Sequence, residues 1–441
     1  MGVMPVGKLL ANMAIPMVIS MLVQAMYNVV DSYFVAKIST DALTAISLAY
    51  PIQMLMIAVA IGTSVGMNSY MSRKLGEGNT EAASKGASNG LCLLLLSAIV
   101  FAIFGFVITP FFRLFTDDPQ LIEMGVDYLE ICMVFGLGVF IQIGCERILQ
   151  SMGKTGLSMV TQLVGAVVNI ILDPLMIFGI GPFPEMGVAG AAYATVIGQW
   201  VGMLMALALV FFKEHEVKIS FKNFRLCGET VREIYRVGIP SIVMQSIGSI
   251  MIVGLNGILA ASEASVTVLG VYYKLQSFVF MPCFGLNQGV MPIIGYNYGA
   301  RNRKRVYSAL KRGIIIGVII MTLGTLAMWI IPEQLISMFG GTEELMKIGV
   351  PAFRIISLCF IPAAAGIIFT TLFQAVGKGM RSLIMSFARQ LVLILPIAFI
   401  FSRIWGIGAV WYAFPIAEIF SLTIAICFFI NLVKGDFKKL G

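Results

Sequence analysis

Charged residues are scarce in this chain. Only 12% of its 441 residues are Asp, Glu, Lys or Arg, whereas 59% are hydrophobic. A soluble protein of ordinary composition carries about twice that charged fraction. Apolar runs of about 20 residues, long enough to cross a bilayer as helices, recur along the whole chain. These runs do not alternate polar and apolar residues, so a membrane β-barrel is excluded. The sequence predicts an all-α integral membrane protein.

Residues that carry enzyme chemistry are also rare. The single histidine, His215, lies in the charged segment KEHEVK, and the seven cysteines are scattered without a CxxC pair. The metalloprotease motif HExxH, the phosphate-binding Walker A motif and the hydrolase motif GxSxG are all missing. We therefore expect a protein that is not an enzyme and that needs no cofactor.

The few basic residues are distributed unevenly about the predicted spans. We place twelve spans at 12–36, 43–71, 87–111, 121–147, 156–180, 186–212, 237–262, 265–297, 311–332, 344–376, 380–403 and 406–433. Of the 30 Lys and Arg residues, 23 fall at the N-terminus, in the even-numbered loops or at the C-terminus. By the positive-inside rule, both termini are cytoplasmic in a multi-pass protein of the plasma (inner) membrane. The net charge of +8 therefore needs no nucleic-acid partner.

The chain contains an internal repeat. At an offset of 223 positions, five residues of the first half match identical residues of the second. They are Gly62, Gly66, Gly76, Asn79 and Gly90, which match Gly285, Gly289, Gly299, Asn302 and Gly313. Each repeat holds six spans, an even number, so both halves enter the membrane in the same orientation. The sequence predicts two six-helix bundles related by a pseudo-two-fold axis along the membrane normal.

The predicted domains follow from this repeat. Residues 1–212 form the N-terminal six-helix lobe, 213–236 a polar cytoplasmic linker, and 237–441 the C-terminal six-helix lobe. Two bundles joined by a charged linker suit transport by alternating access, in which one bundle rocks against the other.

Three segments resemble one transporter family. IPMVISMLVQAMYNVVDSYFVA resembles the first helix of the MATE family, the multidrug and toxic compound extrusion transporters. ILQSMGKTGLSMVTQLVGAVVNIILDPLMIFG, followed by MGVAGAAYATVIGQ, resembles its fourth-to-sixth helix region. FMPCFGLNQGVMPIIGYNYGARN resembles its eighth helix. The resemblance implies a twelve-helix, two-lobe exporter of small molecules in exchange for Na⁺ or H⁺. It also implies that Asp31, Asn169, Asp173 and Thr195 form the cation site.

The positions of the polar residues support the same site. Asp31 and Asp173 both lie about 10 Å below the predicted outer surface, at 1.5 Å of helix rise per residue. Helical spacing places Gln24 and Asn28 on one face with Asp31, and Gln162 and Asn169 on one face with Asp173; Thr195 and Gln199 share a third face. Carboxylate, amide and hydroxyl oxygens suit a hard cation, so Asp31, Asn169 and Asp173 would be metal ligands if the ion is Na⁺.

The aspartates are not repeated in the second half, where Leu255 and Ile397 stand 224 positions after them. The second half instead carries Glu418 within a span, at the position that matches Gln199. Lys274, Arg354 and Arg389 also lie within second-half spans. Intramembrane charges usually have a partner, and Glu418 with Arg389 is a possible pair. Both structural pairing and substrate contact remain open for Glu418.

The leading functional hypothesis is a cation-coupled antiporter that exports small amphipathic organic cations. We expect substrate contacts from Gln24, Tyr27, Asn28, Gln199 and Glu418. Besides its substrate we expect the lipid bilayer as the only partner of a monomeric protein. One alternative is export of anionic metabolites, with the second-half basic residues lining the cavity. The other is a flippase of lipid-linked saccharides, which twelve spans and the aspartate pair disfavour.

Overall fold

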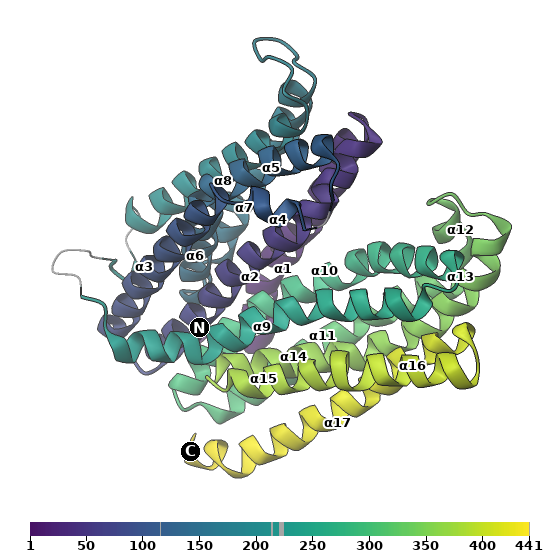
Figure 1. Cartoon of the computed structure of the whole chain (residues 1–441). Helices are drawn as coiled ribbons and strands as arrows, with labels where there is room; N and C mark the ends of the chain where they lie inside the picture. The colour runs from purple at the N-terminus through teal and green to yellow at the C-terminus, as the bar shows by residue number, and fades with distance from the viewer. Residues whose placement is uncertain (115, 213–214, 220–224, 441) are drawn as a thin grey trace. The chain divides into compact units, whose positions relative to one another are not determined.

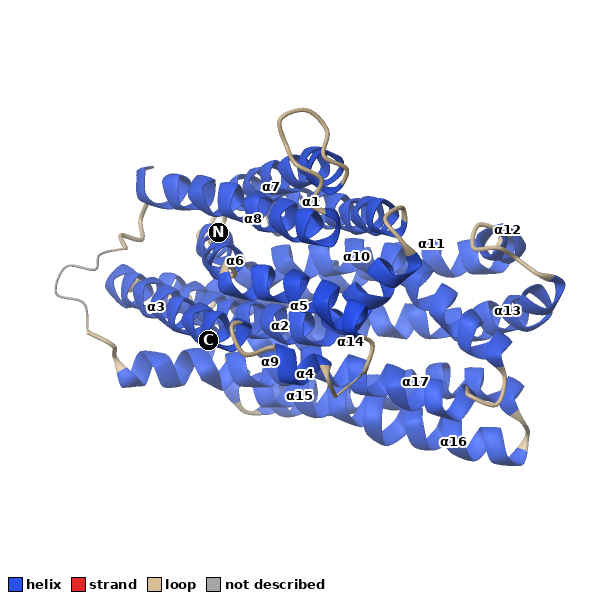
Figure 2. Cartoon of the chain, turned by 45° about the horizontal axis from the view of Figure 1, so that its top comes forward, coloured by secondary structure: helices blue, strands red, loops and turns tan. Residues whose placement is uncertain are grey.

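The regular secondary structure of the described chain is helical throughout (Figure 2). The computed structural model describes residues 1–114, 116–212, 215–219 and 225–440. Eleven helical segments there are long and apolar enough to span a membrane. A bent pair, α5 (Pro119–Val134) and α6 (Leu137–Ser151), forms one more span with a bend of 45°. By length and composition, the twelve predicted spans and the all-α membrane fold are confirmed for the described residues.

Contacts divide the chain into two compact units, and one of them is Ile19–Ile242. Figure 1 follows its helices in chain order. They are the later part of α1 (Val6–Ala36), α2 (Thr40–Gly76), α3 (Thr80–Gly105), α4 (Thr109–Phe112), α5, α6, α7 (Thr155–Ile177), α8 (Gly187–Phe212) and the first part of α9 (Gly228–Leu259).

The other unit combines Met1–Val18 with Val243–Gly441. Its later helices are α10 (Glu263–Gly299), α11 (Arg303–Ile330), α12 (Pro332–Ser337), α13 (Glu343–Ile356), α14 (Phe360–Ala375), α15 (Gly379–Phe387), α16 (Leu395–Ile404) and α17 (Ala413–Lys434). A π-helical segment, Ala388–Ile394, joins α15 to α16 within one span. Such segments are rare and occur often at functional sites.

The first helix of each half is shared between the two units. The unit boundaries fall after Val18 in α1 and after Ile242 in α9, two residues beyond Pro16 and Pro240. Proline removes a helical hydrogen bond and favours a bend, so each helix can change partners there. The start of α1 therefore packs with second-half helices, and the start of α9 with first-half helices.

The predicted domain boundaries, 1–212, 213–236 and 237–441, stay a prediction. Residues 213, 214 and 220–224 of the predicted linker lie outside the described residues. The last part of that linker is helical, because α9 begins at Gly228. Its segment ETVREIYR looks polar, yet Ile234 is fully buried, as expected for an amphipathic helix end on other helices.

Glycines of the repeat allow these helix ends to pack closely. A Cβ atom on Gly66 of α2 would lie 2.1 Å from the carbonyl oxygen of Ile234 in α9. The matching Gly289 of α10 would place a Cβ atom 2.7 Å from the Cα atom of Ala14 in α1. Small residues at such positions let helix backbones approach within contact distance.

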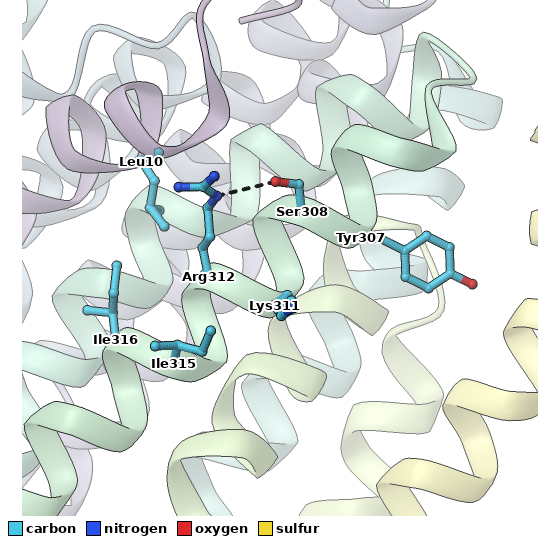
Figure 3. A pocket seen from close by; sticks show the side chains of 8 residues that line it. Leu10, Tyr307, Ser308, Lys311, Arg312, Ile315 and Ile316 are labelled. Carbon is cyan, nitrogen blue, oxygen red and sulfur yellow. Dashed lines mark hydrogen bonds between the residues drawn. The ribbon is translucent and has the colours of Figure 1, made fainter.

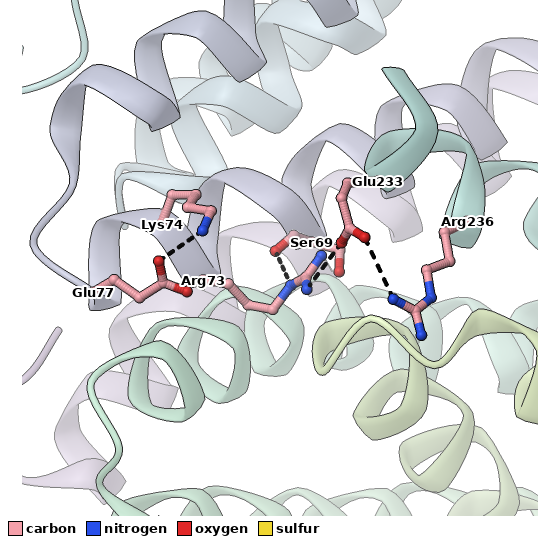
Figure 4. A network of polar contacts seen from close by, with 6 residues as sticks. All are labelled: Ser69, Arg73, Lys74, Glu77, Glu233 and Arg236. Atoms are coloured by element: carbon pink, nitrogen blue, oxygen red, sulfur yellow. Dashed lines mark hydrogen bonds and ion pairs between the residues drawn. The ribbon is translucent and has the colours of Figure 1, made fainter. Parts of the chain in front are cut away.

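An ion-pair network also joins α2 to the start of α9 (Figure 4). Arg73 Nη1 lies 3.5 Å from Glu233 Oε2, and Arg73 Nε donates to the Ser69 carbonyl oxygen at 3.2 Å. Arg236 Nη1 lies 3.4 Å from the other carboxylate oxygen of Glu233. Glu233 thus forms ion pairs with one arginine of α2 and one arginine of α9, within the same unit.

The backbone repeats the sequence repeat. Asn79 and Asn302 cap α3 and α11 with nearly the same dihedral angles, φ −93°, ψ 78° and φ −93°, ψ 81°. Each side chain accepts a hydrogen bond from the amide three residues later, as an N-cap does. These caps start α3 at Thr80 and α11 at Arg303, earlier than the predicted spans, because the helices extend beyond their apolar runs.

Candidate functional site

The two predicted aspartates belong to the same unit, Ile19–Ile242, although they are far apart in sequence. Asp31 lies in the later part of α1 and is half-buried, whereas Asp173 of α7 is completely buried. They are close enough for the charge of Asp31 to act on Asp173. The structure therefore brings together the two carboxylates that the sequence placed at one depth.

Asn169 connects this pair to α8. Its amide nitrogen donates to Thr195 Oγ1 at 3.2 Å and, more weakly, to Asp173 Oδ1 at 3.5 Å. The hydrogen bond between Asn169 of α7 and Thr195 of α8 depends on Gly165 and Gly198. A Cβ atom on Gly198 would lie only 2.7 Å from the Gly165 carbonyl oxygen. Two glycines facing each other let α7 and α8 pack tightly and set the Asn169–Thr195 distance.

Aromatic residues complete the surroundings. Tyr27 lies close to Thr195, which places a predicted substrate residue beside a predicted cation residue. Tyr128 and Cys132 of α5 also lie near Asp31, and Gln53 of α2 donates to the Tyr128 hydroxyl at 3.4 Å. The sequence gives no signal for these α5 residues, because i, i+4 spacing of a tyrosine and a cysteine is ordinary in an apolar helix.

Three buried oxygens at this site have no hydrogen-bond donor among the described residues. They are Asp31 Oδ1, Asn169 Oδ1 and Asp173 Oδ2. Buried polar atoms without a partner are rare and call for an ion, a proton or a water molecule. All three atoms are acceptors, so a cation or a proton satisfies them and an anion does not. In the described part of the chain, no group of three His, Cys, Asp or Glu side chains could hold a metal. A Na⁺ ion here would thus need amide or hydroxyl oxygens besides the two carboxylates.

Other predicted residues differ in their exposure and in their partners. Gln24 and Asn28 are exposed on α1, and Gln199 of α8 is half-buried. Gln162 shares a face with Asn169 but donates to Glu146 Oε2 at 2.7 Å. Residues of the predicted Asp173 face therefore hydrogen-bond two different carboxylates, those of Asp173 and Glu146.

Glu146 of α6 is a buried acid that sequence analysis did not single out. It is 4% exposed, and its Oε1 accepts hydrogen bonds from Gln142 at 3.0 Å and Thr161 at 3.1 Å. It lies one residue before the end of the predicted span 121–147. The dipeptide Glu146–Arg147 was the available signal, since two adjacent charges inside an apolar span are uncommon.

Glu418 lies in the other unit and forms the pair with Arg389 considered from the sequence. Arg389 Nη1 lies 3.4 Å and 3.3 Å from the two carboxylate oxygens of Glu418, which is 4% exposed. Arg389 belongs to the π-helical segment and Glu418 to α17. In the same unit, the buried hydroxyls of Tyr272 and Tyr273 have no partner among the described residues.

Comparison with known proteins agrees with the helical arrangement. The MatE family model matches residues 16–175 and 238–400, which is more than half of the chain. A FAD transporter of Shewanella oneidensis is 27% identical over 418 residues, covering 94% of this chain and 92% of that protein. The multidrug export protein MepA of Staphylococcus aureus is 25% identical over 421 residues, covering 94% and 91%.

A solved structure shows the same fold. A MOP superfamily transporter from Pyrococcus furiosus superimposes with a TM-score of 0.92 at 26% identity, covering 97% of this chain and 96% of its own. A MatE match across both halves identifies a multi-pass membrane transporter that exports compounds. The chain belongs to the MatE family, the multidrug and toxic compound extrusion transporters.

Proposed function

We propose that this protein is a cation-coupled antiporter that exports small, amphipathic organic cations by alternating access. Asp31, Asn169, Asp173 and Thr195 hold the coupling ion, H⁺ or Na⁺. The observation that carries the proposal is the set of three buried acceptor oxygens without a donor on α1 and α7.

The charge of the site gives a reason for coupling. Two carboxylates in apolar surroundings cannot both stay ionised without a counter-charge, so the site takes up a proton or a cation. Release of that ion restores the unfavourable charge, which favours binding of a cationic substrate instead. Antiport requires that binding of the ion and binding of the substrate oppose each other, as they do at one shared site.

Exposed polar groups near the aspartates suit the substrate. Gln24 and Asn28 lie on α1 with Tyr27 between them, and all three lie within two helical turns of Asp31. Amide groups and an aromatic ring bind organic cations by hydrogen bonds and cation–π contact. Gln199 and Glu418 are further substrate contacts in this proposal. The site faces a transport path in the plasma membrane, with both termini cytoplasmic.

The test is uptake of ethidium into everted membrane vesicles, with Na⁺ and pH gradients imposed separately. We expect one gradient to drive uptake by the wild type, and Asp31→Asn or Asp173→Asn to abolish it. Asp41→Asn is the matched control, since Asp41 is exposed in the first turn of α2. Full gradient-driven uptake by both site variants would overturn the proposal.

Export of an anionic metabolite is the second candidate. The FAD transporter of Shewanella oneidensis supports it by similarity, and the intramembrane Arg389 supplies a cation in the second half. Proteoliposomes loaded with flavin adenine dinucleotide would release it under the same gradients. This candidate would be favoured over the first if Arg389→Gln lowered the release of flavin adenine dinucleotide and ethidium did not compete with that release.

A further inference from the structure

A pocket lies where the start of α1 packs on the start of α11 (Figure 3). Both helix ends belong to the unit of Met1–Val18 and Val243–Gly441. Its volume is about 670 Å³. The lining residues are Gly7, Leu10, Tyr307, Ser308, Lys311, Arg312, Ile315 and Ile316.

One side of the pocket is cationic. Lys311 and Arg312 are both exposed there, and neither forms an ion pair with any acid in the described part of the chain. Arg312 Nε donates to Ser308 Oγ at 3.3 Å, which turns the guanidinium toward α1 in Figure 3. The basic groups and the Ser308 hydroxyl offer donors to an anion, and the residues that line the pocket include no carboxylate.

The first turn of α1 adds to the positive potential. A Cβ atom on Gly7 would lie 2.3 Å from Arg312 Nη1, so the guanidinium packs against the backbone of that turn. The helix begins at Val6, and the first amides of a helix carry partial positive charge. A cation beside a helix N-terminus is unfavourable unless an anion balances both, and phosphate is the usual anion there.

The other side of the pocket is apolar and continues along α11. Ile315 is 47% exposed and Ile316 37% exposed, followed by the exposed side chains of Ile319, Leu323 and Leu326. At 1.5 Å of rise per residue, this face extends about 22 Å from Lys311, most of a hydrocarbon core. A ligand with an anionic head and long apolar chains would match both sides.

In the first half of the chain, apolar side chains fill the position that the repeat relates to this pocket. There Leu93, Ile234 and Val231 pack together at the positions that match Ile316, Leu10 and Gly7. Ser88 and Asn89 replace the two basic residues. The repeated scaffold thus forms an apolar cluster in one half and an open cationic pocket in the other. Packing of the helix pair does not require the cationic pocket.

We propose that this pocket binds the phosphate headgroup of an anionic phospholipid, with Lys311 and Arg312 on the phosphate and the acyl chains along α11. The headgroup stabilises the contact between the start of α1 and α11. The inference is independent of the transported substrate and of the coupling ion.

The test uses the purified full-length protein in dodecyl maltoside. Its thermal unfolding midpoint is measured against added dioleoyl phosphatidylglycerol, dioleoyl phosphatidylcholine and inorganic phosphate. The variants are Lys311→Gln with Arg312→Gln, and Gly7→Val, which keeps both charges but fills the pocket as Val231 does. Lys304→Gln with Lys438→Gln removes two exposed cytoplasmic charges outside the pocket and is the matched control.

We expect phosphatidylglycerol to raise the unfolding midpoint of the wild type and of the control at the same lipid concentration. The variant Lys311→Gln with Arg312→Gln should need about tenfold more lipid or more, as the loss of two basic contacts implies. Gly7→Val should also need more lipid, because its side chain takes up the space of the headgroup. Equal dependence on phosphatidylglycerol in wild type and Gly7→Val would overturn the proposal, even if the charge variant failed to fold. Inorganic phosphate or phosphatidylcholine that stabilises as well as phosphatidylglycerol would also overturn it.

Discussion

Buried charges in this protein have two kinds of surroundings. Asp31 and Asp173 lie close enough for the charge of Asp31 to act on Asp173, and both have acceptor oxygens without donors among the described residues. Glu418 instead has the Arg389 guanidinium within 3.3 Å of its carboxylate. The aspartate pair needs a proton or a cation from outside the chain, whereas the Arg389–Glu418 pair is neutral by itself. This difference is why we assign ion coupling to the aspartates and not to Glu418.

The Arg389–Glu418 pair can be tested by a double-mutant cycle. Removing one partner leaves a buried charge without its counter-charge, so Arg389→Gln should lower the free energy of unfolding by up to about 3 kcal/mol. Arg389→Gln with Glu418→Gln should recover much of that loss, because no charge remains buried. The readout is thermal unfolding in detergent, with the exposed Arg403→Gln as the control. Additive losses would show that the two side chains do not stabilise each other.

Helices in this protein are positioned by close backbone contacts at glycines. Gly66 against Ile234 and Gly289 against Ala14 let the ends of α9 and α1 pack on α2 and α10. Gly165 against Gly198 does the same for α7 and α8, where Asn169 reaches Thr195. The proposed cation site and the shared first helices thus depend on the same kind of contact.

Substitution of one such glycine should therefore be costly. Gly66→Ala forces a methyl group against the Ile234 carbonyl oxygen, and the backbones must separate, which overpacking studies put at about 1–3 kcal/mol. Gly257→Ala in the helix α9 meets no atom within 4 Å and should be neutral or slightly stabilising. Thermal unfolding of both variants checks this. Equal stability of the two would contradict the role of the close contact.

The orientation of the whole chain in the membrane rests on its basic residues and can be measured at Cys227. This residue is exposed just before α9, in the predicted cytoplasmic connection between the halves. Hydrogen bonds from the backbone amide and then the side chain of Thr230 lower the pKa of the Cys227 thiol. The thiolate, which reacts with maleimides, therefore persists to lower pH than in an unperturbed cysteine.

A variant that keeps only Cys227 should react with a membrane-impermeant maleimide in everted vesicles and not in intact cells. The labelling rate at pH 7 should fall modestly in Thr230→Ala, because loss of the side-chain hydrogen bond raises the pKa and lowers the thiolate fraction, while the backbone amide of residue 230 still donates. Above the ordinary thiol pKa of about 8.5, the two variants should label at similar rates. Labelling in intact cells would reverse the predicted orientation.

The sequence by itself determined the number of spans and the family. Hydropathy depends on local composition, so twelve apolar runs were visible without any contacts. The repeat and the motif around Asp173 were also linear patterns, and the pair of aspartates followed from their equal depth. Helix ends were less visible: α9 begins at Gly228 because an amphipathic polar segment continues the helix beyond the apolar run.

Only the tertiary structure decided which side chains meet. The sequence placed Gln162 on the face of Asp173. In the structure α6 packs on α7, and Gln162 donates a hydrogen bond to Glu146 of α6. The sequence did not show that Met1–Val18 joins the second-half helices, nor that Lys311 and Arg312 line a pocket with Gly7. Helical periodicity fixes which residues share a face of one helix. Which faces meet depends on contacts between segments that are distant in the chain.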